Sequence, residues 1–374
     1  MPCIEMGGNF CLTSRQIDSF SHDHVPYSKD FMGWDHVVFT HSGRSAIITA
    51  VRHLGLEGCE VLVPTFSCQS ITASFLACNC KVNYYPINRD DLTVKEPELF
   101  RLIDECRPKI LYTCPLFGFD TLSSLRNRYD EIQAQGVKVM EDVTHSLLSD
   151  IDSRGADVVV CSLRKWLEIP DGGFIWGLKD FDIGQFYQSH PEDIDIVKNF
   201  VEASRLKLEY LTTGDEGLKQ VFLPLFYKNN ELFNDCSKVC RMSSFSHGIL
   251  AHADFKRIIE QRRVNYSYLL SHISNPLAEI IFDSLPEQVV PLYMQVYVHG
   301  GMRTPLQQAL IKERLYCPVV WHTPSQVLSE CCLEDTQFHE DMLSLVIDQR
   351  YDLVDMERFV QRINDFKENN GKSF

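Results

Sequence analysis

The stretch CSLRKWLEIPDGGFI, residues 161–175, places a lysine between an apolar run and a ProAspGlyGly turn. A lysine that a fold buries or half-buries is costly unless it is neutralised or paired, and one common solution is a Schiff base to an aldehyde cofactor. Lys165 is therefore the candidate catalytic residue, and pyridoxal phosphate is the cofactor that it implies. That cofactor also needs an acid for its pyridine nitrogen, donors for its phosphate and a flat group against its ring.

The candidate acid lies in VKVMEDVTHS, residues 137–146, which has the pattern of a short buried strand that ends in carboxylates. At the carboxyl end of a parallel strand, Asp142 would point into the crevice where open α/β sheets bind ligands, whereas Glu141 alternates to the other face. In isolation, such a pair more often ends a strand and caps the next turn. Because Lys165 lies downstream, we interpret Asp142 as the acid of the cofactor site.

The candidate phosphate donors lie in HSGRSAIITA, residues 41–50, where a strand pattern is followed by a small-residue turn and a helical pattern. Backbone amides of Ser42, Arg44 and Ser45 at this helix start would face an anion, and Gly43 would let the chain turn tightly. The hydroxyl of Ser162, close before Lys165, could add a further donor. Alone, a SerGly pair before a helix is usually a cap and a turn, and the sequence contains no GxGxxG or GxxxxGK[ST] motif.

Short apolar strands alternate with helical patterns from about residue 36 to residue 177. This alternation predicts an α/β fold with a mainly parallel seven-stranded sheet and helices on both of its faces. The expected strands are residues 37–40, 60–64, 81–85, 109–113, 137–140, 157–161 and 172–176. A long helical pattern over 257–270 opens a smaller C-terminal α/β domain. We therefore expect a large cofactor-binding domain over 1–245, including the N-terminal segment, and a small domain over 246–374.

In this order, the segments resemble the sugar aminotransferases of the DegT/DnrJ type, which have fold type I of the pyridoxal phosphate enzymes, and the resemblance covers most of the chain. In that family a SerGlyThr-like turn binds the phosphate, a GluAsp segment supplies the acid, and a lysine before a GlyGly strand forms the internal aldimine. The matching residues here are 42–44, Asp142 with His145, and Lys165 followed by 172–173. Further similarities lie at 61–66, 241–243, 262–266, 316–321 and 347–351.

The chain departs from the family pattern at three places. The position of the family's ring-stacking aromatic is Cys68 here, and the nearest aromatic residue is Phe66. Val239 stands where the family has an asparagine that reaches the partner subunit's phosphate. The spacing from Ser162 to Lys165 is two residues shorter than in the family, so the loop is expected to take a shorter path.

Other residues have a functional and a structural interpretation. His145 could stack on or hydrogen-bond to the cofactor, or could be a satisfied structural histidine. Arg164 could depress the pKa of Lys165 by like-charge repulsion, or could face solvent. A further group could hold a sugar or an amino-acid carboxylate, because arginine grips carboxylates and phosphates. It could equally form solvated surface or a subunit contact. The group is Trp321, His322, Arg350 and Tyr351.

Composition narrows the class of protein. The formal net charge of -15 argues against binding to nucleic acid or to an anionic membrane surface. The fourteen cysteines include no CysXXCys pair, which argues against a metal site and favours reduced thiols. No apolar stretch is long enough to span a bilayer, and no secretory signal pattern opens the chain. We expect a cytoplasmic enzyme.

The expected activity is a pyridoxal phosphate-dependent aminotransferase that forms an aldimine on Lys165. The resemblance implies a keto sugar, nucleotide-linked, as acceptor, glutamate as donor, and a homodimer with sites at its interface. Related sugar dehydratases carry histidine in place of this lysine, and Lys165 argues against that branch. Two alternatives stay open: a pyridoxal phosphate lyase or racemase acting on an amino acid, and a non-catalytic ligand-binding protein on the same fold.

Overall fold

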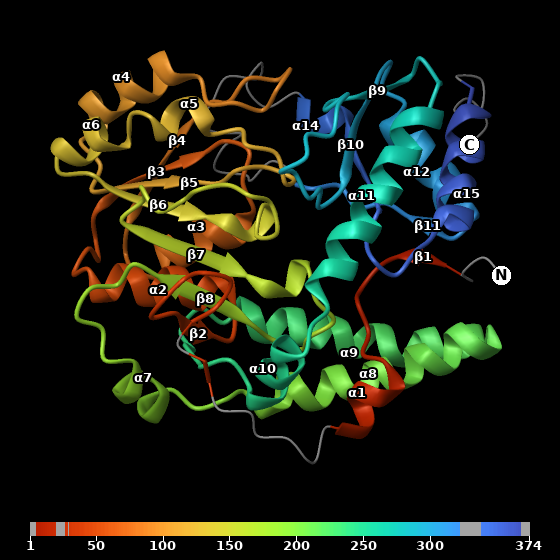
Figure 1. Cartoon of the computed structure of the whole chain (residues 1–374), viewed down its shortest axis with the longest axis horizontal. Coiled ribbons are helices and arrows are strands. Elements are labelled where there is room, and N and C mark those ends of the chain that lie inside the picture. Colours follow the sequence, from red (N-terminus) through yellow and green to blue (C-terminus); the bar gives the residue numbers. More distant parts are fainter. Residues whose placement is uncertain (1–4, 20–26, 29, 322–337, 368–374) are drawn as a thin grey trace.

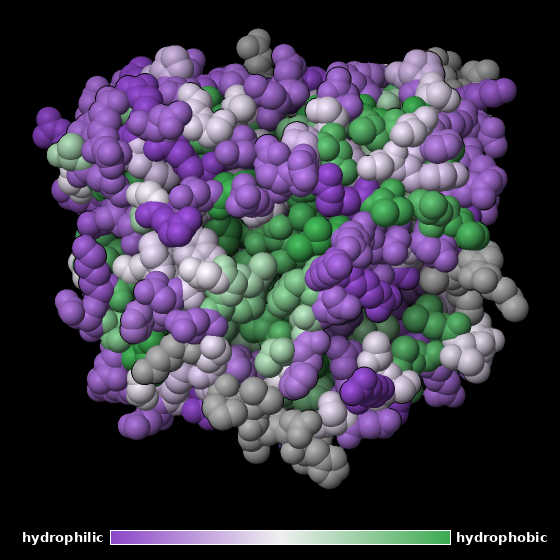
Figure 2. All heavy atoms as spheres, in the orientation of Figure 1, coloured by the Kyte–Doolittle hydropathy of each residue, from purple (hydrophilic) through white to green (hydrophobic). Residues whose placement is uncertain are grey.

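The computed structural model describes residues 5–19, 27–28, 30–321 and 338–367 of the 374-residue chain. Figure 1 shows three groups of elements: a large sheet with its helices, a pair of long helices below it, and the C-terminal elements to the right. Figure 2 shows that hydrophobic side chains gather near the middle of this face, where the three groups meet, within a hydrophilic border. The candidate site lies between the same three groups.

The large sheet has seven strands in the order β2-β8-β7-β6-β5-β3-β4. Its strands are β2 (Val38–Thr40), β3 (Glu60–Pro64), β4 (Lys81–Tyr85), β5 (Ile110–Thr113), β6 (Lys138–Asp142), β7 (Val158–Ser162) and β8 (Gly173–Trp176). All pairings are parallel except those of β8, which runs antiparallel to β7 and to β2. The central strands are continuous buried runs, as expected for strands covered on both faces. The predicted α/β class and the seven strands are confirmed.

Helices connect these strands and pack on them. They are α2 (Gly43–His53), α3 (Gln69–Leu76), α4 (Glu96–Cys106), α5 (Ser123–Arg126), α6 (Tyr129–Ala134) and α7 (Ile183–Ser189). Helix α2 packs against β7, β8 and α3, while α4 packs on β4 and α6 on β6. Two short 3₁₀ turns, η2 (Val143–His145) and η3 (Leu163–Lys165), come directly after β6 and β7. The chain therefore turns sharply at the two strand ends that carry the candidate chemistry.

The middle of the chain forms a helical hairpin of α8 (Ile194–Thr213) and α9 (Glu216–Asn234). Gly214 ends α8 in a left-handed conformation, with φ of 74°, which a glycine adopts without steric cost. The two helices share a separate apolar core with the N-terminal Leu12. No helix in the described ranges is both long enough and apolar enough to cross a membrane.

The C-terminal elements form a second, smaller sheet with its own helices. They are α10 (Ser244–Ala251), α11 (Phe255–His272), β9 (Ala278–Ile280), β10 (Met294–Val298), α12 (Arg303–Lys312), β11 (Leu315–Tyr316), α14 (Phe338–Asp341), β12 (Met342–Leu345) and α15 (Leu353–Asn364). Strand β10 lies between β12 and β9 and is antiparallel to both. Strand β1 (Met6–Gly7) pairs with β11, and α1 (Ser14–Asp18) comes after it in the chain.

The expected boundary between residues 245 and 246 falls inside α10. The start of the chain, which the prediction assigned to the large domain, contributes β1 to a strand pair with the C-terminal part. One apolar core also runs through residues of both parts. The division into two domains stays a prediction.

Candidate active site

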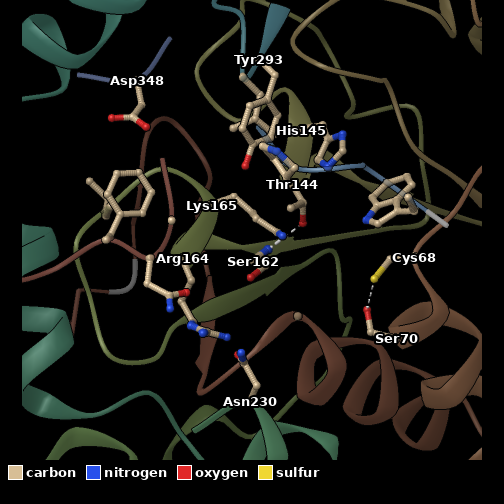
Figure 3. Close-up of a pocket in the computed structure, with 18 of the residues that line it drawn as sticks. Cys68, Ser70, Thr144, His145, Ser162, Arg164, Lys165, Asn230, Tyr293 and Asp348 are labelled. Carbon is tan, nitrogen blue, oxygen red and sulfur yellow. Dashed lines mark hydrogen bonds between the residues drawn. The ribbon is translucent and has the colours of Figure 1, made fainter. Parts of the chain in front are cut away.

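A cavity of about 700 Å³ opens at the carboxyl ends of β6 and β7. Its walls come from the start of α2, the turns after β6 and β7, helix α9, the N-terminal segment 7–10 and parts of the C-terminal region. Figure 3 shows polar side chains from these separate segments pointing into one space. Convergent polar groups in a cavity of this size are typical of a small-molecule site.

Lys165 ends η3 and extends into this cavity, where its side chain is open to the enclosed space but surrounded by protein. Within the described ranges its Nζ has no hydrogen bond and no ion pair. Removal from bulk water lowers the pKa of Lys165, and the nearby guanidinium groups of Arg164 and Arg44 lower it further. A lysine in this state is a better nucleophile and base than a solvated one.

Asp142 is the last residue of β6 and is buried at the cavity wall. One carboxylate oxygen accepts from the Thr144 amide at 2.8 Å and the other from the hydroxyl of Tyr112. Burial raises its pKa, while these two hydrogen bonds and the charge of Lys165 oppose the rise. Its neighbour Glu141 has no access to the cavity, because its carboxylate is bound by Arg126, Tyr129 and Ser153.

Thr144 holds the two catalytic turns together. Its hydroxyl accepts from the Ser162 amide at 2.8 Å, and its carbonyl accepts from the Trp166 indole at 2.7 Å. These bonds cross from the turn after β6 to the turn after β7, as the dashed line between Thr144 and Ser162 shows in Figure 3. Thr144, which is itself uncharged, therefore fixes the distance between the turns that carry Asp142 and Lys165.

The candidate phosphate turn forms the start of α2. Ser42 caps the helix by accepting the Ser45 amide at 3.2 Å, which leaves the other first-turn amides without a side-chain acceptor. Gly43 lies against β7: a Cβ atom there would come within 3.2 Å of the Ser162 Cβ. This close approach brings the start of a helix next to Lys165, where its dipole and amides favour an anion.

The chain matches a known protein family in this region. A model of the DegT/DnrJ/EryC1/StrS aminotransferase family matches residues 14–158, which include the start of α2 and the acidic end of β6. The family recognised from the sequence is confirmed. Its members are aminotransferases, so the predicted enzyme class and the pyridoxal phosphate cofactor are confirmed at the level of the family. The match ends before Lys165, whose role therefore depends on the geometry described above.

Solved structures of aminotransferases have the same fold. The aminotransferase PseC of Helicobacter pylori, involved in the biosynthesis of pseudoaminic acid, aligns with a TM-score of 0.70 at 13% identity over 96% of this chain and 98% of PseC. A DegT DnrJ EryC1 StrS aminotransferase of Brucella abortus aligns with a TM-score of 0.63 at 15% identity, over 96% and 92% of the two chains. NtdA of Bacillus subtilis, solved with bound cofactor PMP, gives 0.62 at 16%, over 95% and 78%. No curated protein has a matching sequence.

In this DegT/DnrJ-type fold the ring contacts differ from the sequence expectation. Phe66 is buried behind the cavity wall, where it packs against Phe117 and Trp321. Cys68 does line the cavity, and its sulfur accepts from the Ser70 hydroxyl at 3.0 Å. Trp321, which comes from far along the chain, is among the aromatic residues that line the cavity. The structure thus brings Cys68 and Trp321 to the site but keeps Phe66 out of it.

His145 lies on the cavity wall with its ring stacked on Trp321, at 4.8 Å between centroids. It is buried, and its Nδ1 has no hydrogen-bond partner in the part of the chain that is described. Burial, together with the charge of Lys165, lowers the pKa of His145 to about 3. The imidazole is therefore neutral, with a ring nitrogen that a ligand can satisfy.

Two of the other predicted substrate residues, Arg350 and Tyr351, are already engaged by other groups of the chain. Arg350 lines the cavity, but its guanidinium is bound to Asp348 and to the Asn9 carbonyl. Tyr351 is buried, and its hydroxyl accepts the Gly7 amide at 2.8 Å. His322 lies outside the described residues.

Val239, at the position of the family's asparagine, is partly buried against the main apolar core. Other cavity residues were not predicted at all: Gly8, Phe10, Asn230, Tyr293 and Asp348. Thr144 and Asp348 did have a sequence signal, because Thr144 lies between Asp142 and His145 in the quoted motif and Asp348 lies in the segment 347–351.

Proposed function

We propose that the protein is an aminotransferase that uses pyridoxal phosphate to convert the keto group of a nucleotide-linked sugar into an amine, with glutamate as the donor. The observation that carries the proposal is Lys165, an amine without a partner among the described residues, in a cavity shared with the buried carboxylate of Asp142. The two groups end adjacent parallel strands beside a helix start. This arrangement supplies an amine for the aldehyde, an acid for the pyridine nitrogen and amides for the phosphate of the cofactor.

The residues present fit the cofactor. Within the described ranges Asp142 is a buried carboxylate without an ion pair, and the protonated nitrogen of a pyridine ring would supply one. The start of α2 at Ser42 and Gly43 offers amides to the phosphate. His145 offers a neutral ring nitrogen at the wall, within reach of groups in the cavity. Trp321 presents an aromatic surface beside it.

Bound pyridoxal phosphate supplies an aldehyde that exchanges with amines and a ring that withdraws electrons from the reacting carbon. Lys165 would hold the cofactor through its amine and, when the donor amine takes its place, would serve as the base that moves a proton at the substrate carbon. Its lowered pKa increases the fraction of neutral amine that can accept this proton. Asp142 keeps the ring nitrogen protonated in both half-reactions.

The assignment to sugars is supported by the family and by the relatives of this fold, of which PseC is involved in making pseudoaminic acid. Beyond the cofactor residues, the cavity has a polar wall that includes Asn230, Tyr293 and Asp348, which suits a polyhydroxylated substrate. Glutamate, the nucleotide linkage and a cytoplasmic location are parts of the proposal that come from the sequence.

We also propose that the enzyme works as a homodimer. Helix α9 lines the cavity with Phe226, Asn229 and Asn230 on one side. The same helix also exposes large apolar residues, Val221, Leu223 and Tyr227, the last 66% exposed, and Leu223 and Tyr227 form a row with Asn230 at four- and seven-residue helical spacing. A second copy packed on this row would lie next to the site. Sedimentation of the purified protein tests this part, and a monomer at micromolar concentration would contradict it.

The activity is tested by the absorption spectrum of the protein with pyridoxal phosphate, before and after glutamate, followed by borohydride reduction and peptide mapping. We expect a visible band that disappears with glutamate as pyridoxamine phosphate forms, and a reduced adduct on Lys165 when borohydride is added before glutamate. Lys165→Ala is the matched control and should give no band. A nucleotide-linked keto sugar should then restore the band, whereas the free keto sugar should do so less well.

Failure to form the adduct on Lys165 would exclude an aminotransferase and leave a binding protein on this fold. An adduct without pyridoxamine phosphate after glutamate would instead point to a lyase or racemase, because only transamination leaves the amine on the cofactor.

A further inference from the structure

Two arginines at the bottom of the cavity have no acidic partner. The Arg164 guanidinium lies over the Phe233 ring at 3.9 Å, and within the described ranges it has no hydrogen bond or ion pair. Arg44 donates to the Phe233 carbonyl at 3.1 Å and to the Asn234 side chain at 2.9 Å, both uncharged, and its buried Nε has no partner there. Both side chains line the cavity. Their charges are therefore not neutralised by the parts of the chain that the structure describes.

Such a pair is unfavourable without an anion. Burial, together with the positive charge of Arg44, lowers the pKa of Arg164 to about 10. Asp171 is the acidic group that acts on Arg164, but its carboxylate is already bound to Ser243 and Ser246. Partly buried guanidinium groups that repel one another are stabilised when a dianion lies between them.

The position of this pair fits a phosphate. Ser42, Gly43 and Ser162 line the same cavity, and α2 is an eleven-residue helix whose N-terminus opens there. Arg164 also directly precedes Lys165 in η3 (Figure 3). A phosphate bound by Arg164 would therefore be held by the residue that directly precedes Lys165, the candidate catalytic amine.

We propose that Arg164, together with Arg44, binds the phosphate of the cofactor, so that one chain supplies both the amides and the cations of the phosphate site. This inference rests on the proposed function, because it takes pyridoxal phosphate as the ligand. Arginine matches phosphate oxygens in a bidentate geometry that backbone amides alone do not provide. Binding of the phosphate would also hold η3 in place, which makes Arg164 a positioning residue for Lys165.

The test compares pyridoxal phosphate with pyridoxal, which has the same aldehyde but no phosphate. Arg164→Met should weaken binding of pyridoxal phosphate by about 10- to 100-fold, the usual effect of losing a charge-assisted contact, and should change binding of pyridoxal by less than about twofold. Arg164→Lys should give an intermediate loss. Arg128→Met is the matched control, because Arg128 also lies over a phenylalanine, at 3.6 Å from the Phe100 ring, but outside the cavity.

Titration of inorganic phosphate into the cofactor-free protein gives a second readout that needs neither the aldehyde nor Lys165. We expect heat of binding in the native protein and in Arg128→Met, and none in Arg164→Met. Melting curves show whether each variant is folded. The inference fails if Arg164→Met weakens pyridoxal and pyridoxal phosphate equally, or weakens neither, or if Arg128→Met behaves in the same way.

The proposed function has a different signature of failure. A native protein that binds inorganic phosphate through Arg164 but forms no adduct with either aldehyde would keep the anion site and contradict the aminotransferase. A native protein that forms the adduct with both aldehydes equally well would keep the aminotransferase and contradict the role of Arg164.

Discussion

The arginines at the two ends of the cavity differ in whether an acidic side chain pairs with them. At the α2 end, the charges of Arg44 and Arg164 have no acidic partner in the described part of the chain. At the other end, Arg350 makes two hydrogen bonds of 2.8 Å to Asp348, donates to a backbone carbonyl of the N-terminal segment, and lies over the rings of Phe10 and Tyr351. Burial opposes the charged form of Arg350, but Asp348 more than compensates and raises its pKa.

This difference distinguishes a side chain that can bind a ligand from one that has only a structural role. A buried charge that is paired and fully hydrogen-bonded has nothing left to offer a ligand, whereas an unpaired one is stabilised when a ligand arrives. Arg350 therefore ties the N-terminal segment to the C-terminal part of the cavity. Lys165 and Arg164 remain available for the cofactor.

The largest expected effect is at the unpaired end. Lys165→Met should lower the rate of amino transfer on the order of 10²–10⁴-fold or more, because both the proton transfer and the attachment of the cofactor are lost. The free energy of unfolding should stay the same or rise, since burial without a partner disfavours the charged lysine. Single-turnover kinetics with glutamate and urea unfolding measure the two quantities. A clear loss of stability would show that Lys165 is structural.

The paired end should respond in the opposite way. Asp348→Ala leaves Arg350 buried without its carboxylate and should lower the free energy of unfolding by about 3–5 kcal/mol. Asp152→Ala, which removes the partner of the exposed Arg154, is the matched control and should have little effect. Arg164→Met should also have little effect. If Asp348→Ala and Arg164→Met were equally stable in urea, the distinction between the two ends would be wrong.

A third effect concerns the loop between Lys165 and β8. Asp171 in this loop accepts from the Ser243 amide at 2.8 Å and from two hydroxyls, which fastens the loop to the start of α10. Burial raises the pKa of Asp171 to about 6. Between its ordinary pKa and this value, the folded protein binds a proton that the unfolded chain has released, so this contribution to stability decreases as the pH rises.

Asp171→Asn removes that titration. Relative to this variant, the native protein should lose roughly 2–3 kcal/mol of unfolding free energy between about pH 4 and about pH 7, from two pKa units at 1.36 kcal/mol each. Urea unfolding of both proteins across this range measures the difference. A difference that is independent of pH would mean that the carboxylate is ionised throughout.

The parts of the site that depend on local sequence could be predicted. Alternation of apolar runs located all seven strands, and the ends of β6 and β7 placed Asp142 and Lys165 together because neighbouring parallel strands end at the same edge. The start of α2 was predicted for a similar reason. Sequence analysis also identified Arg164, but could not decide between the cavity and solvent, because the direction of a side chain in a short turn depends on its neighbours.

The parts that come from distant segments could not be predicted. Asn230 reaches the cavity because α9 packs on α8, and Tyr293 reaches it from the C-terminal part. Phe66 was chosen as a ring contact because it is close to Cys68 in sequence, but its side chain points into the core. Trp321 occupies the wall through long-range packing against Phe66 and His145.

The smallest expected effect concerns the position of Cys68, where the family has an aromatic ring that stacks on the cofactor. Cys68 and Lys165 line the same cavity. Cys68→Phe would supply an aromatic ring at this position and should tighten pyridoxal phosphate binding by about 2- to 10-fold, the worth of one stacked ring pair. Cys68→Val is the control for the loss of the thiol and its bond from Ser70. If Cys68→Phe bound the cofactor no better than Cys68→Val, the ring of the cofactor would already be supported at the Trp321 and His145 wall, and the unpaired end of the cavity would recognise the cofactor chiefly through its phosphate.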